Sequence, residues 1–193
     1  MKRLEDLVQR AKKLKEKGLT TGEIADELNV SRETALWLLT KGEVAPADIY
    51  IEWKSLSNTF RLRNVAAIMA DMIQDVAEPE TVIGVATSGI PIATMVAEEL
   101  GCELSMYYPR KLKWEKGEAQ SGGVLSENFA RIEGKRCVVV DDVITTGSTI
   151  KEVAEYAERK DAEVQCACVI IDKRGIDKIS GFPVLSIFRI LRL

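Results

Sequence analysis

Two consecutive acids precede a hydroxyl-rich turn in the second half of the chain. Asp141 and Asp142 follow a run of β-branched residues, which predicts a strand over Arg136–Val140 that is buried on both faces. The acids then lie at the carboxyl end of this strand, where open α/β sheets bind their ligands. The residues of the turn open a predicted helix, where backbone N–H groups and the helix dipole favour an anion. They are Thr145, Thr146, Gly147, Ser148 and Thr149.

Carboxylates do not bind a phosphate, but they accept hydrogen bonds from vicinal hydroxyls and help to anchor Mg²⁺. An anion site beside two acids therefore predicts a phosphorylated ribose as ligand. The alternative is a buried strand followed by a capped helix, in which these side chains only satisfy backbone groups. That alternative explains each residue separately but does not explain their order.

The ordered pattern resembles the fingerprint of the type I phosphoribosyltransferases. The resemblance implies that residues 145–149 hold the 5-phosphate of phosphoribosyl pyrophosphate (PRPP). It also implies that Asp141 and Asp142 hold the ribose 2- and 3-hydroxyls. Mg²⁺ is expected together with PRPP, and no metal site is expected from protein side chains alone.

A second small-residue turn contains Thr87, Ser88 and Gly89, between a predicted strand and a helix with Pro91 in its first turn. This turn resembles the pyrophosphate-binding loop of orotate phosphoribosyltransferases. Taken alone, a Ser-Gly turn before a helix is ordinary. Its occurrence beside the first motif favours a pyrophosphate subsite.

A lysine-rich segment at 109–123 resembles the loop of the same enzymes that closes over pyrophosphate. Arg110 and Lys111 match the start of that loop and are expected to bind pyrophosphate. The position of the catalytic lysine holds Trp114, and that of the following histidine holds Lys116, unless a shifted register makes Lys113 the catalytic residue. The alternative is a solvated connection.

After the next predicted strand, Lys173 or Arg174 stands where the enzymes use an arginine for orotate. Both departures fall on residues that define the reaction and its base, whereas the phosphoribosyl-binding residues match. This asymmetry predicts binding without efficient turnover. The chain has no histidine, which excludes His-based acid/base catalysis. Its four cysteines lack C-x-x-C spacing and are expected to be small buried side chains.

The first forty residues predict three short helices, starting with a helix over residues 3–17. Thr20 and Glu23 have capping-box spacing, and Ser31 is a candidate N-cap of the third helix. The unit resembles a helix-turn-helix, which implies DNA contacts from the start and outer face of the third helix. The candidates are Ser31, Arg32, Thr34 and Trp37. The alternative, suggested by the weak net charge of the unit, is a dimerisation or substrate-hood module.

The composition agrees with one α/β domain plus a small appendage, since 193 residues are 46% hydrophobic with a formal charge of −3. We predict a helix-turn-helix domain over 1–45 and a ligand-sensing domain over 46–193. In the second domain we expect a short strand around 49–53 and then a parallel, doubly wound sheet. Its expected elements are helix 62–76, strands 81–85, 103–107, 136–140 and 164–171, and helices 91–100 and 148–159.

This combination resembles the archaeal GfcR-type transcriptional regulators, described as orotate-phosphoribosyltransferase-like proteins. The resemblance implies a DNA-binding regulator whose transferase-type domain senses a phosphorylated metabolite. From the site residues we expect PRPP or a related phosphosugar as effector. We also expect a homodimer, because one short recognition helix makes too few DNA contacts. The alternatives are an active phosphoribosyltransferase that uses PRPP and Mg²⁺ and a regulator with an empty pocket. No apolar run is long enough to span a bilayer and the start is amphipathic, so we expect a cytoplasmic protein with no membrane partner.

Overall fold

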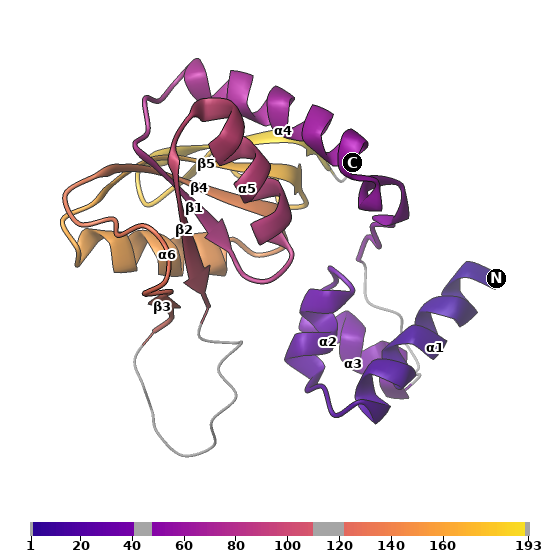
Figure 1. Ribbon diagram of the computed structural model, residues 1–193. Coiled ribbons are helices and arrows are strands. Elements are labelled where there is room, and N and C mark those ends of the chain that lie inside the picture. Colours follow the sequence, from indigo (N-terminus) through magenta and orange to yellow (C-terminus); the bar gives the residue numbers. More distant parts are fainter. Residues whose placement is uncertain (1, 41–47, 110–121, 192–193) are drawn as a thin grey trace. The chain divides into compact units, whose positions relative to one another are not determined.

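The computed structural model describes residues 2–40, 48–109 and 122–191 (Figure 1). The chain forms two compact units, Met1–Trp53 and Lys54–Leu193. We describe each unit by itself.

Three helices form the first unit: α1 (Lys2–Glu16), α2 (Thr21–Glu27) and α3 (Arg32–Thr40). The predicted capping box is present, since Glu23 N–H donates to Thr20 Oγ1 and Thr20 N–H donates to the Glu23 carboxylate. Ser31 Oγ accepts the N–H of Thr34 at 3.1 Å and caps α3 as predicted. The three helices share one apolar core, formed by Leu7, Val8, Ala11, Ile24, Ala25, Leu28, Val30, Ala35 and Leu38.

Residues 48–53 form no strand, in contrast to the prediction, and belong to the first unit. The carboxylate of Asp48 accepts the N–H of Ser31 at 2.6 Å. The guanidinium of Arg10 donates to the hydroxyl of Tyr50 and lies 6.0 Å from the centre of its ring. Because these contacts hold the segment against α1 and α3, the first unit extends to Trp53 and does not end at residue 45.

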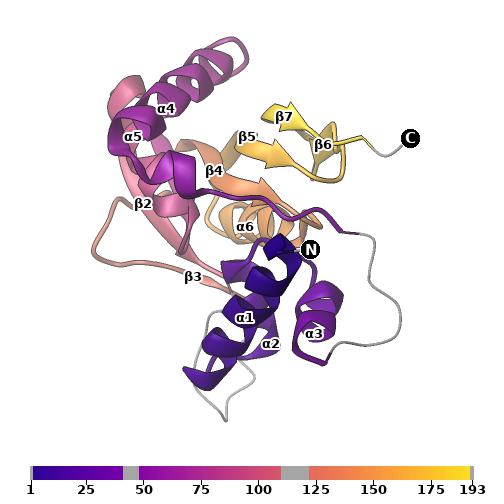
Figure 2. The same cartoon turned by 90° about the vertical axis from the view of Figure 1, so that its right-hand side faces the viewer.

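The second unit contains a seven-stranded sheet in the order β3-β2-β1-β4-β5-β7-β6 (Figure 2). The strands β1, β2, β4, β5 and β7 are parallel, and the short β3 and β6 pair antiparallel at the two ends of the sheet. This arrangement confirms the predicted mostly parallel α/β fold. The strands β3, β6 and β7 were not predicted from the sequence. The bounds are β1 Thr81–Val85, β2 Glu103–Tyr108, β3 Val124–Leu125, β4 Arg136–Ile144, β5 Glu163–Asp172, β6 Lys178–Ile179 and β7 Phe182–Arg189.

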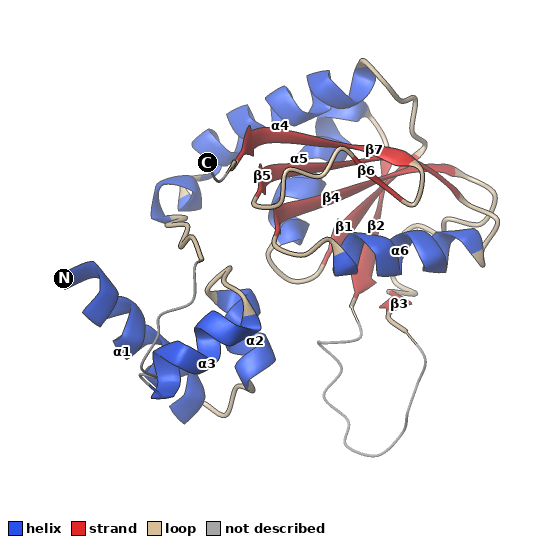
Figure 3. Ribbon diagram, turned by 180° about the vertical axis from the view of Figure 1, so that it is seen from behind, coloured by secondary structure: helices blue, strands red, loops and turns tan. Residues whose placement is uncertain are grey.

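Helices cover both faces of the sheet, with α4 (Thr59–Gln74) and α5 (Gly89–Leu100) on one side and α6 (Ser148–Glu158) on the other (Figure 3). A short 3₁₀ helix, η1 (Lys54–Ser57), precedes α4. The helix α4 begins three residues before the predicted start because the side chain of Asn58 accepts the N–H of Arg61 at 3.2 Å. The two-sided cover explains why the central strands are apolar throughout, as in β1, where all five residues are buried.

Three cysteines are buried in this core, and all four are free thiols. Burial raises the pKa of the Cys137 and Cys166 thiols to about 12, so both stay protonated at neutral pH. Cys102 is half-buried and its Sγ donates to the carbonyl of Pro79. The prediction of small buried side chains is confirmed for Cys137, Cys166 and Cys168, whereas Cys102 is only partly buried. Within the described residues, no helix is both long and apolar enough to cross a membrane.

Candidate functional site

The strand β4 extends past the end of its neighbour β1, and the acid pair lies in this extension. The pairing with β1 ends at Gly84 and Val140, whereas the pairing with β5 continues to Ile144. The predicted strand end at Val140 is therefore wrong, because β5 still pairs with Asp141, Val143 and Ile144. Asp141 and Asp142 lie inside the strand, beyond its last residue that pairs with β1, and their residues are only 9% and 8% exposed.

Each carboxylate of the pair is positioned by the backbone that follows it. Asp141 Oδ1 accepts the N–H of Asp142, and Asp142 Oδ1 accepts the N–H of Val143, both at 2.9 Å. These bonds fix the direction of two acids that are largely withdrawn from water. Charge-assisted bonds from a ligand's hydroxyls gain strength in such a setting.

The turn between β1 and α5 lies directly against this acid pair. A Cβ atom built on Gly89 would lie 2.7 Å from Asp141 Oδ1 and 3.2 Å from the carbonyl oxygen of Val140. Only a residue without a side chain allows α5 to start this close to β4. The side chains of Thr87 and Ser88 are exposed beside the contact, and the Ala86–Thr87 peptide bond is cis. The fold therefore brings together the second and first sequence motifs.

The hydroxyl-rich turn follows β4 and leads into α6. Gly147 has φ +83°, a left-handed conformation that other residues rarely adopt, and its missing Cβ would lie 3.1 Å from Ile176. Thr146 Oγ1 lies 2.8 Å from Ser148 Oγ and accepts the Ser148 N–H at 3.3 Å. Gly147 has no side chain to cap α6, so the first turn of that helix presents N–H groups and the hydroxyl of Thr149. N–H groups at the start of a helix favour an anion, and the anion site at this turn stays a prediction.

A further turn, at the end of β5, is organised by an acid that the sequence analysis did not select. Asp172 is fully buried and accepts the N–H groups of Arg174, Gly175 and Ile176 at 2.7–3.0 Å. Arg189 of β7 lies 3.7 Å from the same carboxylate. Asp172 thus fixes the loop that carries Lys173 and Arg174. The sequence could have indicated this role of Asp172 only by its position, directly after a predicted buried strand.

Gly123, at the end of the lysine-rich segment, lies beside the buried Tyr107. The hydroxyl of Tyr107 donates to Glu152 of α6 at 3.1 Å, and its ring packs edge-on against Tyr156. Burial, followed by the charge of Glu152, raises the pKa of the Tyr107 hydroxyl. The backbone of Gly123 packs against this group. The residues predicted to bind pyrophosphate or to catalyse, Arg110, Lys111 and Lys113, lie outside the described residues, as do Trp114 and Lys116.

The third helix of the first unit exposes a different set of residues from the predicted one. Arg32 is exposed, as predicted. Thr34 is only 8% exposed, and its hydroxyl lies 2.8 Å from that of Ser31. Trp37 is partly exposed and packs against the apolar core of the unit. Its contact with DNA stays a prediction.

The described residues place few potential metal ligands close together. Among residues 2–40, 48–109 and 122–191, no three Asp, Glu or Cys side chains are close enough together to hold a metal ion. The two carboxylates of the acid pair supply hard oxygen ligands of the kind Mg²⁺ accepts, with the other ligands left to a phosphorylated compound or water.

This chain is similar to one protein family, to relatives named as regulators and to solved enzymes. Residues 52–188 match the family described as phosphoribosyl transferase domain. The protein from Archaeoglobus fulgidus named transcriptional regulator GfcR is 59% identical over 196 residues. The protein of the same name from Methanosarcina mazei is 45% identical over 204 residues. Both alignments cover 100% of this chain and 100% of the relative.

Two solved enzymes resemble the second unit. Orotate phosphoribosyltransferase from Aeropyrum pernix aligns with a TM-score of 0.59 and 27% identity, over 78% of this chain and 83% of that one. Adenine phosphoribosyltransferase from Thermoanaerobacter pseudethanolicus aligns with a TM-score of 0.61 and 17% identity, over 77% of this chain and 91% of that one. The second likeness shows the fold alone.

Removal of the Asp172 carboxylate tests how the 173–176 turn is held. In Asp172→Ala, three backbone amides and Arg189 lose their common acceptor, so the free energy of unfolding should fall by about 3 kcal/mol. Asp177→Ala is the matched control, since Asp177 contacts the same Arg189 at 2.7 Å from an exposed position. It should cost less than about 1 kcal/mol in the same urea titration. Equal losses in the two variants would contradict the role given to Asp172.

Proposed function

This chain belongs to the family of the transcriptional regulators named GfcR, and we propose that it is a DNA-binding regulator whose phosphoribosyltransferase-like unit binds PRPP or a related phosphosugar as effector. The close approach of Gly89 to Asp141 carries the effector half of the proposal, because it places a pyrophosphate-type turn against the acid pair. We also propose that the protein acts in the cytoplasm and that it is a homodimer.

The ligand site is proposed from the chemistry of three segments. Backbone N–H groups and hydroxyls of residues 145–149 suit a terminal phosphate. Asp141 and Asp142 suit two vicinal ribose hydroxyls, and residues 87–89 suit a second phosphate group beside them. Asp141 and Asp142 would also offer carboxylate oxygens to a Mg²⁺ ion bound together with the ligand, and the ion would neutralise phosphate charge.

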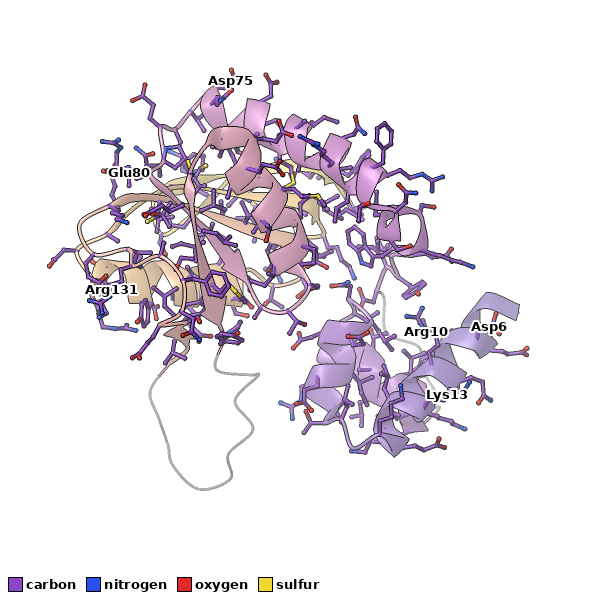
Figure 4. All side chains as sticks on the ribbon, in the orientation of Figure 1. Asp6, Arg10, Lys13, Asp75, Glu80 and Arg131 are labelled. Atoms are coloured by element: carbon purple, nitrogen blue, oxygen red, sulfur yellow. The ribbon has the colours of Figure 1, made fainter. Side chains whose placement is uncertain are left out.

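The DNA-binding half of the proposal rests on the first unit. Its helices α2 and α3 have the order and length of a helix-turn-helix, and α1 carries exposed positive charge, including Arg10 and Lys13 (Figure 4). One nine-residue helix makes few base contacts, so a dimer that presents two such helices is the usual solution. This need for two half-sites supports the proposed homodimer.

The effector site is tested with the Asp141→Asn/Asp142→Asn double variant. Its affinity for PRPP with Mg²⁺ in calorimetry should fall by about 1.5–3 kcal/mol for each lost charge-assisted bond. Asp161→Asn, an exposed aspartate at the end of α6, is the control and should bind as the wild type does. Unchanged affinity in the double variant would remove PRPP and its relatives as ligands of this site.

Turnover with orotate should be absent or feeble. Trp114 and Lys116 occupy the positions that organise the departing pyrophosphate in the enzymes that this chain resembles. The loss of positioned charge of this kind costs about 10²–10³ in rate. Pyrophosphate release from PRPP, measured with and without orotate, checks this expectation. A turnover of about 1 s⁻¹ or more would favour the enzyme over the regulator.

If the first unit binds DNA, single lysines of that unit should contribute to the dependence of the affinity on salt concentration. Lys13→Ala should weaken binding to all duplexes alike and reduce the slope of log affinity against log salt by about 1, since one phosphate contact is lost. Lys160→Ala changes a partly exposed lysine of the second unit, which pairs with Glu133, and serves as the control. If the two variants behave alike in anisotropy titrations, the first unit does not contact DNA.

A regulator must also couple the two sites. We expect saturating PRPP to change the affinity for operator DNA at least fivefold, within the range of about 5- to 150-fold that such couplings typically show. By linkage, operator DNA then changes the affinity for PRPP by the same factor. The Asp141→Asn/Asp142→Asn variant should keep DNA binding and lose the shift. Overlapping titrations for a ligand that demonstrably binds would show two uncoupled sites.

A further inference from the structure

The polar residues at the start of α3 are committed to the structure of the first unit. The hydroxyls of Ser31 and Thr34 lie 2.8 Å apart, and Ser31 Oγ also accepts the Thr34 N–H. The backbone N–H of Ser31 donates to the Asp48 carboxylate at 2.6 Å. With a carboxylate already at the N-terminal end of α3, a DNA phosphate there would meet like charge.

The outer face of α3 is formed instead by four exposed residues: Arg32, Glu33, Leu36 and Thr40. Leu36 is 53% exposed, whereas Leu38, two positions later, is completely buried. Arg32 and Leu36 are four residues apart and therefore lie one above the other on the same face of the helix. Glu33 lies on that face as well, three residues before Leu36.

The mixture of these side chains fits base edges better than the phosphate backbone. A carboxylate such as Glu33 repels phosphates, but it accepts a hydrogen bond from the amino group of cytosine in the major groove. An exposed leucine has no partner on a phosphate backbone, whereas the methyl group of thymine offers it apolar contact. The guanidinium of Arg32 matches the two acceptors of guanine.

We propose that Arg32 and Leu36 are the residues that specify sequence, with Arg32 on a guanine and Leu36 on the methyl group of a thymine in the major groove. The proposal rests on DNA binding by the first unit and deepens it by naming the bases. Four residues of helix rise about 6 Å, and base pairs rise about 3.4 Å, so the two bases lie about two steps apart. Ser31, Thr34 and Trp37 then support α3 from within the unit.

The experiment selects duplexes with a randomised 20-base-pair core on the wild-type full chain and measures affinity by anisotropy. In the selected duplex, uracil then replaces one thymine at a time, which removes only one 5-methyl group. At the thymine that Leu36 contacts, the wild type should lose affinity about fourfold, as expected for one buried methyl group. Leu36→Ala should bind the two duplexes equally. Arg32→Ala should lose preference for guanine and keep discrimination between thymine and uracil.

Leu4→Ala is the matched control, because Leu4 is a 49% exposed leucine of α1 in the same unit. It should retain the fourfold discrimination. Leu36 is exposed and alanine favours helices, so circular dichroism should show an intact fold for Leu36→Ala. Leu36→Met, which keeps the apolar bulk, should retain most of the discrimination.

The proposal would be overturned if Leu36→Ala still discriminated between thymine and uracil, or if the wild type did not. Sedimentation of each variant tests a second copy of the chain as the occupant of this face. A Leu36→Ala protein that dissociates and weakens on all duplexes alike would assign Leu36 to a dimer contact and overturn the proposal. Failure of the wild type to bind any duplex at low salt would instead contradict DNA binding itself.

Discussion

The contact between the start of α5 and Asp141 controls how the two main sequence motifs meet. Gly89 lies where any Cβ atom would meet the carboxylate, so the turn after β1 reaches the acid pair only because this residue has no side chain. The contact also requires β4 to extend past β1, since a strand that ended at Val140 would leave the acids in a loop. One backbone approach thus joins a turn after β1 to acids that lie about fifty residues later.

A second buried acid stabilises the other side of the same site. Asp172 concentrates three backbone donors and the guanidinium of Arg189 on one carboxylate, which compensates the cost of burying its charge. The turn that it holds contains Ile176, which packs against Gly147 of the hydroxyl-rich turn. The hydroxyl-rich turn is therefore supported from the end of β5 as well as by its own helix.

The first unit separates structural polar groups from exposed ones. Ser31, Thr34 and Asp48 satisfy one another at the start of α3, and Tyr50 and Arg10 hold the exit segment against α1. The residues left facing outward on α3 are few and chemically mixed. A short helix with a rigid base and a small exposed face is suited to specific recognition, because little conformational freedom is lost on binding.

Elements with local signals could be predicted from the sequence. The β-branched run before Asp141, the spacing of Thr20 and Glu23 and the order of the 145–149 residues each act within a few positions, and a strand and two helices begin at the predicted places. The length of β4, the strands β3, β6 and β7, the role of Asp172 and the outward face of α3 could not be predicted in this way. These features depend on partners distant in sequence: β5 extends β4, and core packing partly covers Trp37 and leaves Leu36 exposed. Local pattern fixes which residues form a helix or strand, whereas long-range packing fixes which of them remain free to bind.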